Sequence, residues 1–228
     1  MKKWTLLEQL VTPDGSNLSL AEHDGTYAIR VNGRELMSSR HSFSEEQLGV
    51  VACEPLRKAK GARVLIGGLG LGFTLRAALA TLARDAHVLV AELLPEVVTW
   101  NQNPNYALAA AELADARTQI VIGDVARVIE QSEARFDAIM LDADNQTTSM
   151  NTAGNTRLFQ TSGLAAVHRA LKSGGNAVYW SAGEEPAFAE RFAKSGFNVE
   201  VRRVARHPGS RASHFLLIGQ RITARPRT

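Results

Sequence analysis

Short runs in which apolar and polar residues alternate occupy much of the first forty positions of the chain. They are residues 18–20, 27–31 and 34–37. Asp24-Gly25 and Asn32-Gly33 separate them, and these dipeptides readily adopt the positive φ angles that two-residue hairpin turns require. The pattern predicts a small antiparallel β meander, which we assign to a first domain of residues 1–43.

A helix is expected directly after the meander. Ser44 and Gln47 have the spacing of a capping box, in which the serine accepts from first-turn amides and the glutamine reaches back. Pro55 should bend or end this helix, because proline lacks the N–H that a helix interior needs.

After residue 61, apolar runs of strand length alternate with helical segments. Strands are expected at 63–66, 87–91, 119–122, 136–141 and 176–180, and helices at 74–83, 95–101, 125–131 and 162–171. Apolar strands separated by helices indicate an α/β fold with a parallel sheet covered on both faces. The last two strands, at 198–204 and 214–218, are too close for a crossover helix and should form an antiparallel hairpin. We assign residues 44–228 to this second domain.

Four glycines connect the first parallel strand to the helix after it, namely Gly67, Gly68, Gly70 and Gly72. Glycine lets the backbone pass close to a ligand, and the helix N-terminus behind it offers free amides. Phe73 stands where a dinucleotide fingerprint needs its third glycine, which weakens a pyrophosphate interpretation. The spacing instead resembles the nucleoside-binding loop of S-adenosylmethionine-dependent transferases.

Acidic residues end the next two strands. Glu92 follows the glycines by about 20 residues, where an acid can accept from both ribose hydroxyls of a nucleoside. Asp124 is placed to accept from an adenine amino group while a neighbouring amide, that of Val125, donates to the ring. Asp124 also has the position of an N-cap for the helix that begins at Val125, and the two roles are compatible.

Two further acids, Asp142 and Asp144, end the fourth parallel strand. In an extended chain they share one face about 7 Å apart. Such a pair can hold a cationic amine and take its proton, or it can chelate a metal. With no histidine or third acid close in sequence, we expect an amine and no metal.

Cysteine content, the lengths of apolar runs and the distribution of charge limit the location and the partners that we expect for this protein. Cys53 is the only cysteine, which excludes an intrachain disulfide and fits a cytoplasmic location. No apolar run approaches the roughly 18 residues of a membrane span, and the first residues lack the form of a signal peptide. The net charge of +3 is uneven, since residues 198–228 carry +6 and residues 1–197 carry −3. Nucleic acid is therefore not an expected partner, because the basic charge belongs to one C-terminal segment.

Taken in order, the glycine segment, Glu92, Asp124 and Asp142 with its polar loop resemble the spermidine synthase group of polyamine aminopropyltransferases. The meander followed by the acid pair Glu45-Glu46 points the same way. The resemblance implies a seven-stranded methyltransferase-like Rossmann sheet with an antiparallel last hairpin, preceded by a small β domain. It also implies decarboxylated S-adenosylmethionine as co-substrate, a small amine as acceptor, and a homodimer.

The resemblance also assigns roles by position. Glu92 would bind the ribose, Asp124 the adenine, and Asp142 the attacking amine as the catalytic residue. The other residues placed at the substrate are Asp144, Glu45 and Glu46. Residues 144–162 would form a loop that closes over the site.

The chain departs from the pattern of this group at three places. A leucine, Leu69 or Leu71, replaces the usual aspartate of the glycine loop. Asp142-Ala-Asp-Asn-Gln replaces Asp-Ser-x-Asp-Pro, and Gln47-Leu-Gly replaces Tyr-His-Glu. Aminopropyl transfer is the leading hypothesis. The alternatives are a small-molecule methyltransferase that uses S-adenosylmethionine, and a non-catalytic nucleoside-binding protein of the same fold.

Overall fold

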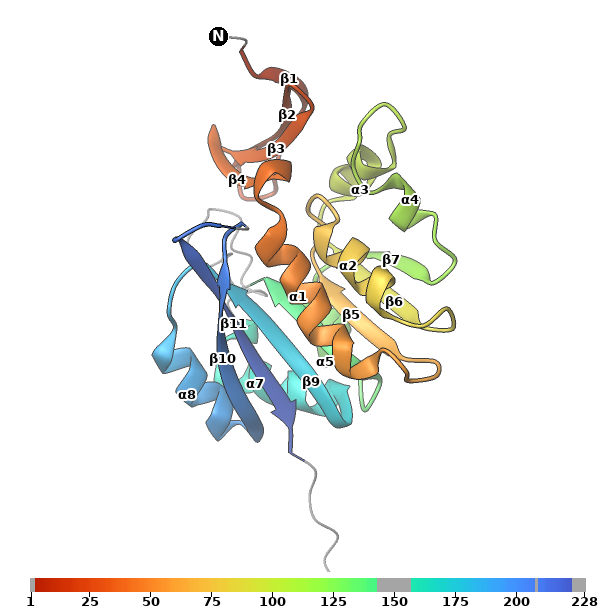
Figure 1. Cartoon of the computed structure of the whole chain (residues 1–228), viewed down its shortest axis with the longest axis vertical. Helices are drawn as coiled ribbons and strands as arrows, with labels where there is room; N and C mark the ends of the chain where they lie inside the picture. Colours follow the sequence, from red (N-terminus) through yellow and green to blue (C-terminus); the bar gives the residue numbers. More distant parts are fainter. Residues whose placement is uncertain (1–2, 143–156, 208, 223–228) are drawn as a thin grey trace, which may run out of the picture.

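The computed structural model describes residues 3–142, 157–207 and 209–222, and these residues form two sheets with helices around the larger one (Figure 1). The smaller sheet lies at one end of the molecule, at the top of Figure 1, and the larger α/β unit lies below it.

The smaller sheet is the predicted meander with one strand more than expected. Its strands β1 (Thr5–Val11), β2 (Asn17–His23), β3 (Thr26–Val31) and β4 (Arg34–Ser38) pair antiparallel in chain order. Asp24 and Asn32 have φ angles of 48° and 50°, as the predicted turns require. The sequence did not reveal β1 because it is an edge strand. Leu6 and Val11 are more than half exposed there, so no alternation marks a buried face.

The helix α1 (Phe43–Cys53) starts earlier than expected. The predicted capping box of Ser44 and Gln47 is wrong: the residue before the helix is Ser42, whose hydroxyl donates to Oε1 of Glu46 at 2.8 Å. Ser44 instead lies fully buried in the first turn, because α1 packs that side of the turn against the α/β unit. Pro55 follows in a short 3-10 turn (Glu54–Leu56), so the helix ends where proline predicted.

The larger sheet has the predicted architecture. Its strands are β5 (Arg63–Gly67), β6 (His87–Glu92), β7 (Thr118–Ile122), β8 (Phe136–Asp142), β9 (Leu171–Ser181), β10 (Phe197–Ala205) and β11 (Ser213–Arg221). They lie in the order β7-β6-β5-β8-β9-β11-β10. Strands β5 to β9 run parallel, and β11 runs antiparallel to both of its neighbours. The chain therefore has the methyltransferase-like α/β fold with an antiparallel last hairpin.

Helices cover both faces of this sheet (Figure 1). One face carries α1 with α2 (Phe73–Thr81), α3 (Pro95–Gln102) and α4 (Ala110–Leu113), and the other carries α5 (Val125–Glu130), α7 (Thr161–Ala170) and α8 (Pro186–Lys194). Successive residues of β5 serve the two cores in turn: Val64 and Ile66 pack into the first, and Leu65 packs into the second. Apolar residues of β2 and β3 join the first core, so the small sheet and the α/β unit are packed together.

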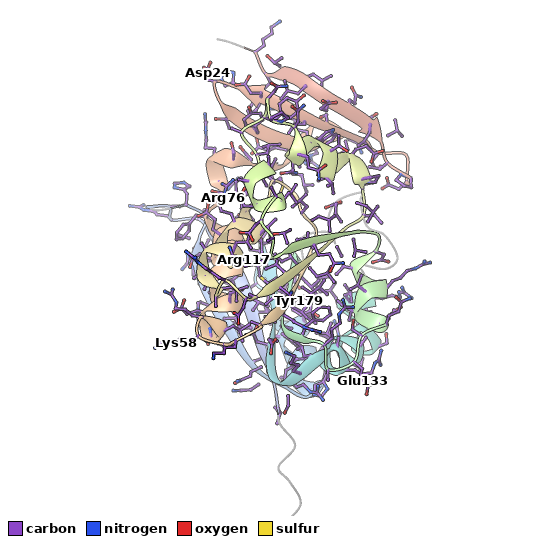
Figure 2. All side chains as sticks on the ribbon, turned by 90° about the vertical axis from the view of Figure 1, so that its right-hand side faces the viewer. Asp24, Lys58, Arg76, Arg117, Glu133 and Tyr179 are labelled. Atoms are coloured by element: carbon purple, nitrogen blue, oxygen red, sulfur yellow. The ribbon has the colours of Figure 1, made fainter. Side chains whose placement is uncertain are left out.

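Two helices, α4 and α8, were absent from the prediction. A single turn such as α4 carries too few residues to show a period. In α8, Phe188 and Phe192 stand one turn apart and are both buried, which is the spacing that sequence reasoning missed. Their rings meet Tyr179, which is fully buried and labelled in Figure 2, in edge-on contacts of 4.9 and 5.2 Å between ring centres.

No helix among the residues that the structure describes is long and apolar enough to cross a membrane.

Candidate functional site

A cavity of about 360 Å³ lies where the carboxyl ends of the parallel strands meet the small sheet and α1. Its size is within the roughly 300–1,000 Å³ of small-molecule sites, and open α/β sheets bind their ligands at this edge. The described wall includes residues 66–71 at the end of β5, 91–94 at the end of β6, 123–125 after β7, Leu141 and Trp180, together with residues of β4 and α1. The structure thus brings together most of the segments that the sequence singled out.

The glycine loop follows β5 directly. Gly67 ends that strand, and Gly68, Gly70 and Gly72 have φ angles of 87°, 53° and 81°. At Gly72, immediately before α2, a Cβ atom would overlap the side chain of Ala109. At Gly68 a Cβ would meet no atom within 4 Å, so this residue is glycine for its backbone conformation. The loop therefore brings its backbone to the edge of the cavity in a form that few other residues adopt.

Glu92 ends β6 and lies behind the glycine loop. Its side chain is buried, with the residue 7% exposed, and each carboxylate oxygen accepts a backbone amide. Oε2 accepts from Leu69 at 2.8 Å, and Oε1 accepts from Leu94 at 2.9 Å. Burial raises the pKa of Glu92, and the backbone hydrogen bonds oppose that shift. Glu92 therefore holds the glycine loop, and the residue also lines the cavity.

Asp124 stands at the end of β7 and lines the same cavity with Val125. Its Oδ1 accepts from the amide of Ala126 at 2.8 Å, which confirms the predicted N-cap of α5. The amide of Gly123 donates to the carbonyl of Glu92 at 2.8 Å, and this bond fixes the ends of β7 and β6 relative to each other.

The acid pair of α1 divides between two environments. Glu45 lines the cavity, and burial is the main cause that raises its pKa. The Ser44 hydroxyl donates to Oε2 of Glu45 at 2.6 Å. Glu46 is not among the described residues of the cavity wall; its carboxylate accepts from Ser42 at the start of the helix.

Asp142 is the last residue of β8. Its backbone pairs with Trp180 of β9, and both Trp180 and the preceding Leu141 line the cavity. Asp144 and residues 145–156 of the expected closing loop lie outside the described residues.

The cavity wall contains residues that the sequence did not assign to the site, among them Glu35 and Met37 of β4. Met37 lies over the glycine loop, with its sulfur 2.8 Å from where a Cβ on Gly70 would be. Trp180 has a buried indole N–H that finds no hydrogen-bond partner in the described part of the chain, which makes it a donor for a ligand. The alternation of polar and apolar residues at 34–37 indicates a strand. Only the packing of the small sheet shows that this strand covers the cavity.

Carboxylates are the ionisable groups in the described part of the wall, contributed by Glu35, Glu45, Glu92 and Asp124. No group of three or more histidine, cysteine or acidic side chains among the described residues is arranged to hold a metal ion. Where these carboxylates are ionised, the described wall favours a cationic ligand over an anionic one, because no basic side chain there offsets their charge.

Of the comparisons with known proteins, the one with solved structures bears on the fold. No family model matches the chain, and a search of curated proteins finds no match. Among solved structures, spermidine synthase in complex with the transition-state analogue AdoDATO is similar, with a TM-score of 0.73 and 17% identity over 96% of this chain and 73% of that chain. Spermidine synthase from Thermotoga maritima is similar with a TM-score of 0.73 and 16% identity over the same shares of the two chains. The chain therefore has a spermidine synthase-like fold.

Proposed function

We propose that this protein transfers an aminopropyl group from decarboxylated S-adenosylmethionine to a small amine. The observation that carries the proposal is the acidic wall of a cavity that also contains the glycine loop and Glu92. Decarboxylated S-adenosylmethionine brings a sulfonium and an ammonium, and the amine acceptor brings a further positive charge. The shared fold with spermidine synthases supports the same assignment.

The nucleoside part of the proposed co-substrate has residues suited to it. Glu92 would accept from the ribose hydroxyls, because it lines the cavity at the end of β6 beside the glycine loop. Asp124 and the amide of Val125 take the adenine edge at the end of β7. Gly68 leaves open space at the loop, where the nucleoside passes close to the backbone.

Aminopropyl transfer requires that the amine be aligned with the carbon attached to sulfur and that one group accept a proton. A sulfonium is already an activated leaving group, so the protein has to place a neutral amine in line with the carbon attached to sulfur. A free amine has a pKa near 10 and arrives protonated. We assign Asp142 to orient the amine and receive its proton. Asp144 and Glu45 would hold the remaining charges of the acceptor, whereas Glu46, which lies outside the described cavity wall, is not given this role.

The rival reaction is methyl transfer from S-adenosylmethionine. Its co-substrate differs from that of aminopropyl transfer by one carboxylate. The carboxylated co-substrate brings a negative charge into an acidic wall. Two like unit charges about 4 Å apart repel by about 4 kcal/mol at an effective dielectric constant near 20, so a co-substrate carboxylate placed beside an ionised wall carboxylate would lose on the order of a hundredfold or more in affinity. The wall therefore favours the decarboxylated form.

Calorimetry with S-adenosylmethionine, its decarboxylated form and 5′-methylthioadenosine tests the proposal. We expect the decarboxylated form and 5′-methylthioadenosine to bind more tightly than S-adenosylmethionine, and 5′-methylthioadenosine to be released when an amine is added. Tighter binding of S-adenosylmethionine with methylated product would establish the rival reaction. A nucleoside bound without turnover of any amine would indicate the non-catalytic alternative.

Asp142→Asn should abolish turnover and keep the affinity for 5′-methylthioadenosine. Asp137→Asn is the matched control, because Asp137 lies in the same strand at its other end, where it accepts from the amide of Arg63 and from Lys172. Full activity in Asp142→Asn would remove Asp142 from the mechanism.

A further inference from the structure

A hydrogen-bonded chain leads from the cavity to the last hairpin. The Ser44 Oγ is 2.6 Å from Oε2 of Glu45 and 2.9 Å from Nδ1 of His214 in β11. Ser44 is fully buried, Glu45 lines the cavity, and His214 is partly exposed on its strand. The three side chains therefore connect a cavity carboxylate to a histidine at the surface of the protein.

The single proton of the Ser44 hydroxyl allows two arrangements of this chain. When Glu45 is ionised, Ser44 donates to the carboxylate and accepts from an Nδ1–H of His214. When Glu45 is protonated, its O–H donates to Ser44, and Ser44 donates to an unprotonated Nδ1. Changing the charge of Glu45 thus reverses both hydrogen bonds and changes the tautomer of His214.

The surroundings of Glu45 and His214 bring the pKa values of the two side chains closer together. Burial is the main cause that raises the pKa of Glu45, and burial followed by the charge of Arg206 lowers that of His214. Glu46 also raises the pKa of Glu45, and Arg206 lowers it. A proton moves most readily between groups whose pKa values are close. The ring of Trp180 meets the His214 ring edge-on, with 4.6 Å between ring centres, and holds it toward Ser44.

We propose that Glu45 is a proton-linked binding site for the ammonium group of an amine, and that Ser44 and His214 carry away the proton that Glu45 loses. The proposed transfer starts from the arrangement in which Glu45 is protonated and Ser44 donates to Nδ1 of His214. When an ammonium binds, the Glu45 O–H bond breaks and its proton bonds to Ser44 Oγ, while the Ser44 proton passes to Nδ1 of His214. The resulting imidazolium gives its Nε2 proton to water, so one proton leaves for each Glu45 that ionises. The choice of an amine rests on the proposed function.

Nuclear magnetic resonance of the histidine rings tests the relay on the whole protein, with 1,4-diaminobutane added in the presence of 5′-methylthioadenosine. We expect the amine to move His214 from the Nε2–H to the Nδ1–H tautomer in the wild type. Ser44→Ala and Glu45→Gln should abolish this response, and Glu45→Gln should also weaken amine binding about tenfold to a hundredfold, the worth of one hydrogen bond to a charged group.

Two controls separate the relay from general damage. Ser132→Ala removes another buried hydroxyl, which donates to the carbonyl of Val128 in α5, and should respond like the wild type. His168, partly buried against Phe197, should keep its signals in every variant. If Ser44→Ala does not fold, Glu45→Gln gives the same comparison.

The failures of the two proposals are distinguishable. Amine binding without any change of the His214 tautomer, or a wild-type response in Ser44→Ala, would overturn the relay and leave aminopropyl transfer standing. If 1,4-diaminobutane does not bind, the proposed function loses its acceptor, and a pH titration decides the relay. The relay then requires His214 of the wild type to change from the Nε2–H to the Nδ1–H tautomer as rising pH ionises Glu45, and to make no such change in Glu45→Gln; an unchanged tautomer in the wild type refutes it.

Discussion

Replacing Glu92 by glutamine separates the two tasks of this side chain. The wild-type carboxylate accepts the amides of Leu69 and Leu94 at 2.8 and 2.9 Å while buried at the cavity wall. A glutamine of the same shape has one acceptor oxygen and one NH2 group. It can serve only one of the two amides, and it presents a donor to the other.

The size of the effect follows from these contacts. A buried amide left without a partner costs about 1–3 kcal/mol. Burial raises the pKa of Glu92 because it makes the charged carboxylate costly, and a neutral glutamine does not carry that cost. The net loss in free energy of unfolding should therefore lie near the lower end, at about 1 kcal/mol. In nucleoside binding, the loss of one hydrogen bond to a charged group, about 1.5–3 kcal/mol, weakens affinity about tenfold to a hundredfold.

Two measurements on the same variant test this reasoning, urea denaturation for stability and calorimetry with 5′-methylthioadenosine for affinity. Asp137→Asn is the control, since Asp137 also accepts a backbone amide, from Arg63 at 2.7 Å, but at the opposite edge of the sheet. It should lose stability and keep its affinity. If Glu92→Gln loses stability and binds the nucleoside like the wild type, then Glu92 only holds the loop, and its assigned ribose contact is wrong.

Three further predictions follow from single residues. Gly72→Ala should lower the free energy of unfolding by about 1–3 kcal/mol in a urea titration, because φ is 81° and the new Cβ overlaps Ala109. Gly183 has open space around it, so the control Gly183→Ala should leave the free energy of unfolding unchanged. Cys53 is fully buried with its pKa raised to about 12, so a disulfide reagent at pH 8 should modify it only after unfolding, and rapid labelling of the native protein would contradict this. Since burial raises the pKa of Glu45 above its ordinary 4.5, the folded state binds that proton more tightly than the unfolded state. The stability of the wild type relative to Glu45→Gln should therefore fall as pH rises from 4.5 through the raised pKa, and a relative gain in urea midpoint over that range would refute the assignment.

Local chemistry was enough to predict most of the elements from the sequence. The Asp24-Gly25 and Asn32-Gly33 turns form because these residues tolerate positive φ. Apolar strands separated by helices gave the parallel sheet and its final hairpin, and the capping role of Asp124 followed from its place before α5. Each of these features depends on neighbours a few residues away, which a linear pattern records.

Tertiary packing decided what each of these elements faces. Glu45 and Glu46 are adjacent in sequence, but successive residues of a helix point about 100° apart. Of the two, only Glu45 lies on the buried face of α1 and lines the described cavity wall. The same packing made Ser44 a buried partner of a histidine 170 positions away instead of a helix cap. It also placed Met37 of the small sheet over the glycine loop. The periodicity of the sequence determined which residues of each element are buried. Only the packing of the elements against one another determined which of those residues share a site, because contacts between segments distant in sequence are not recorded in local spacing.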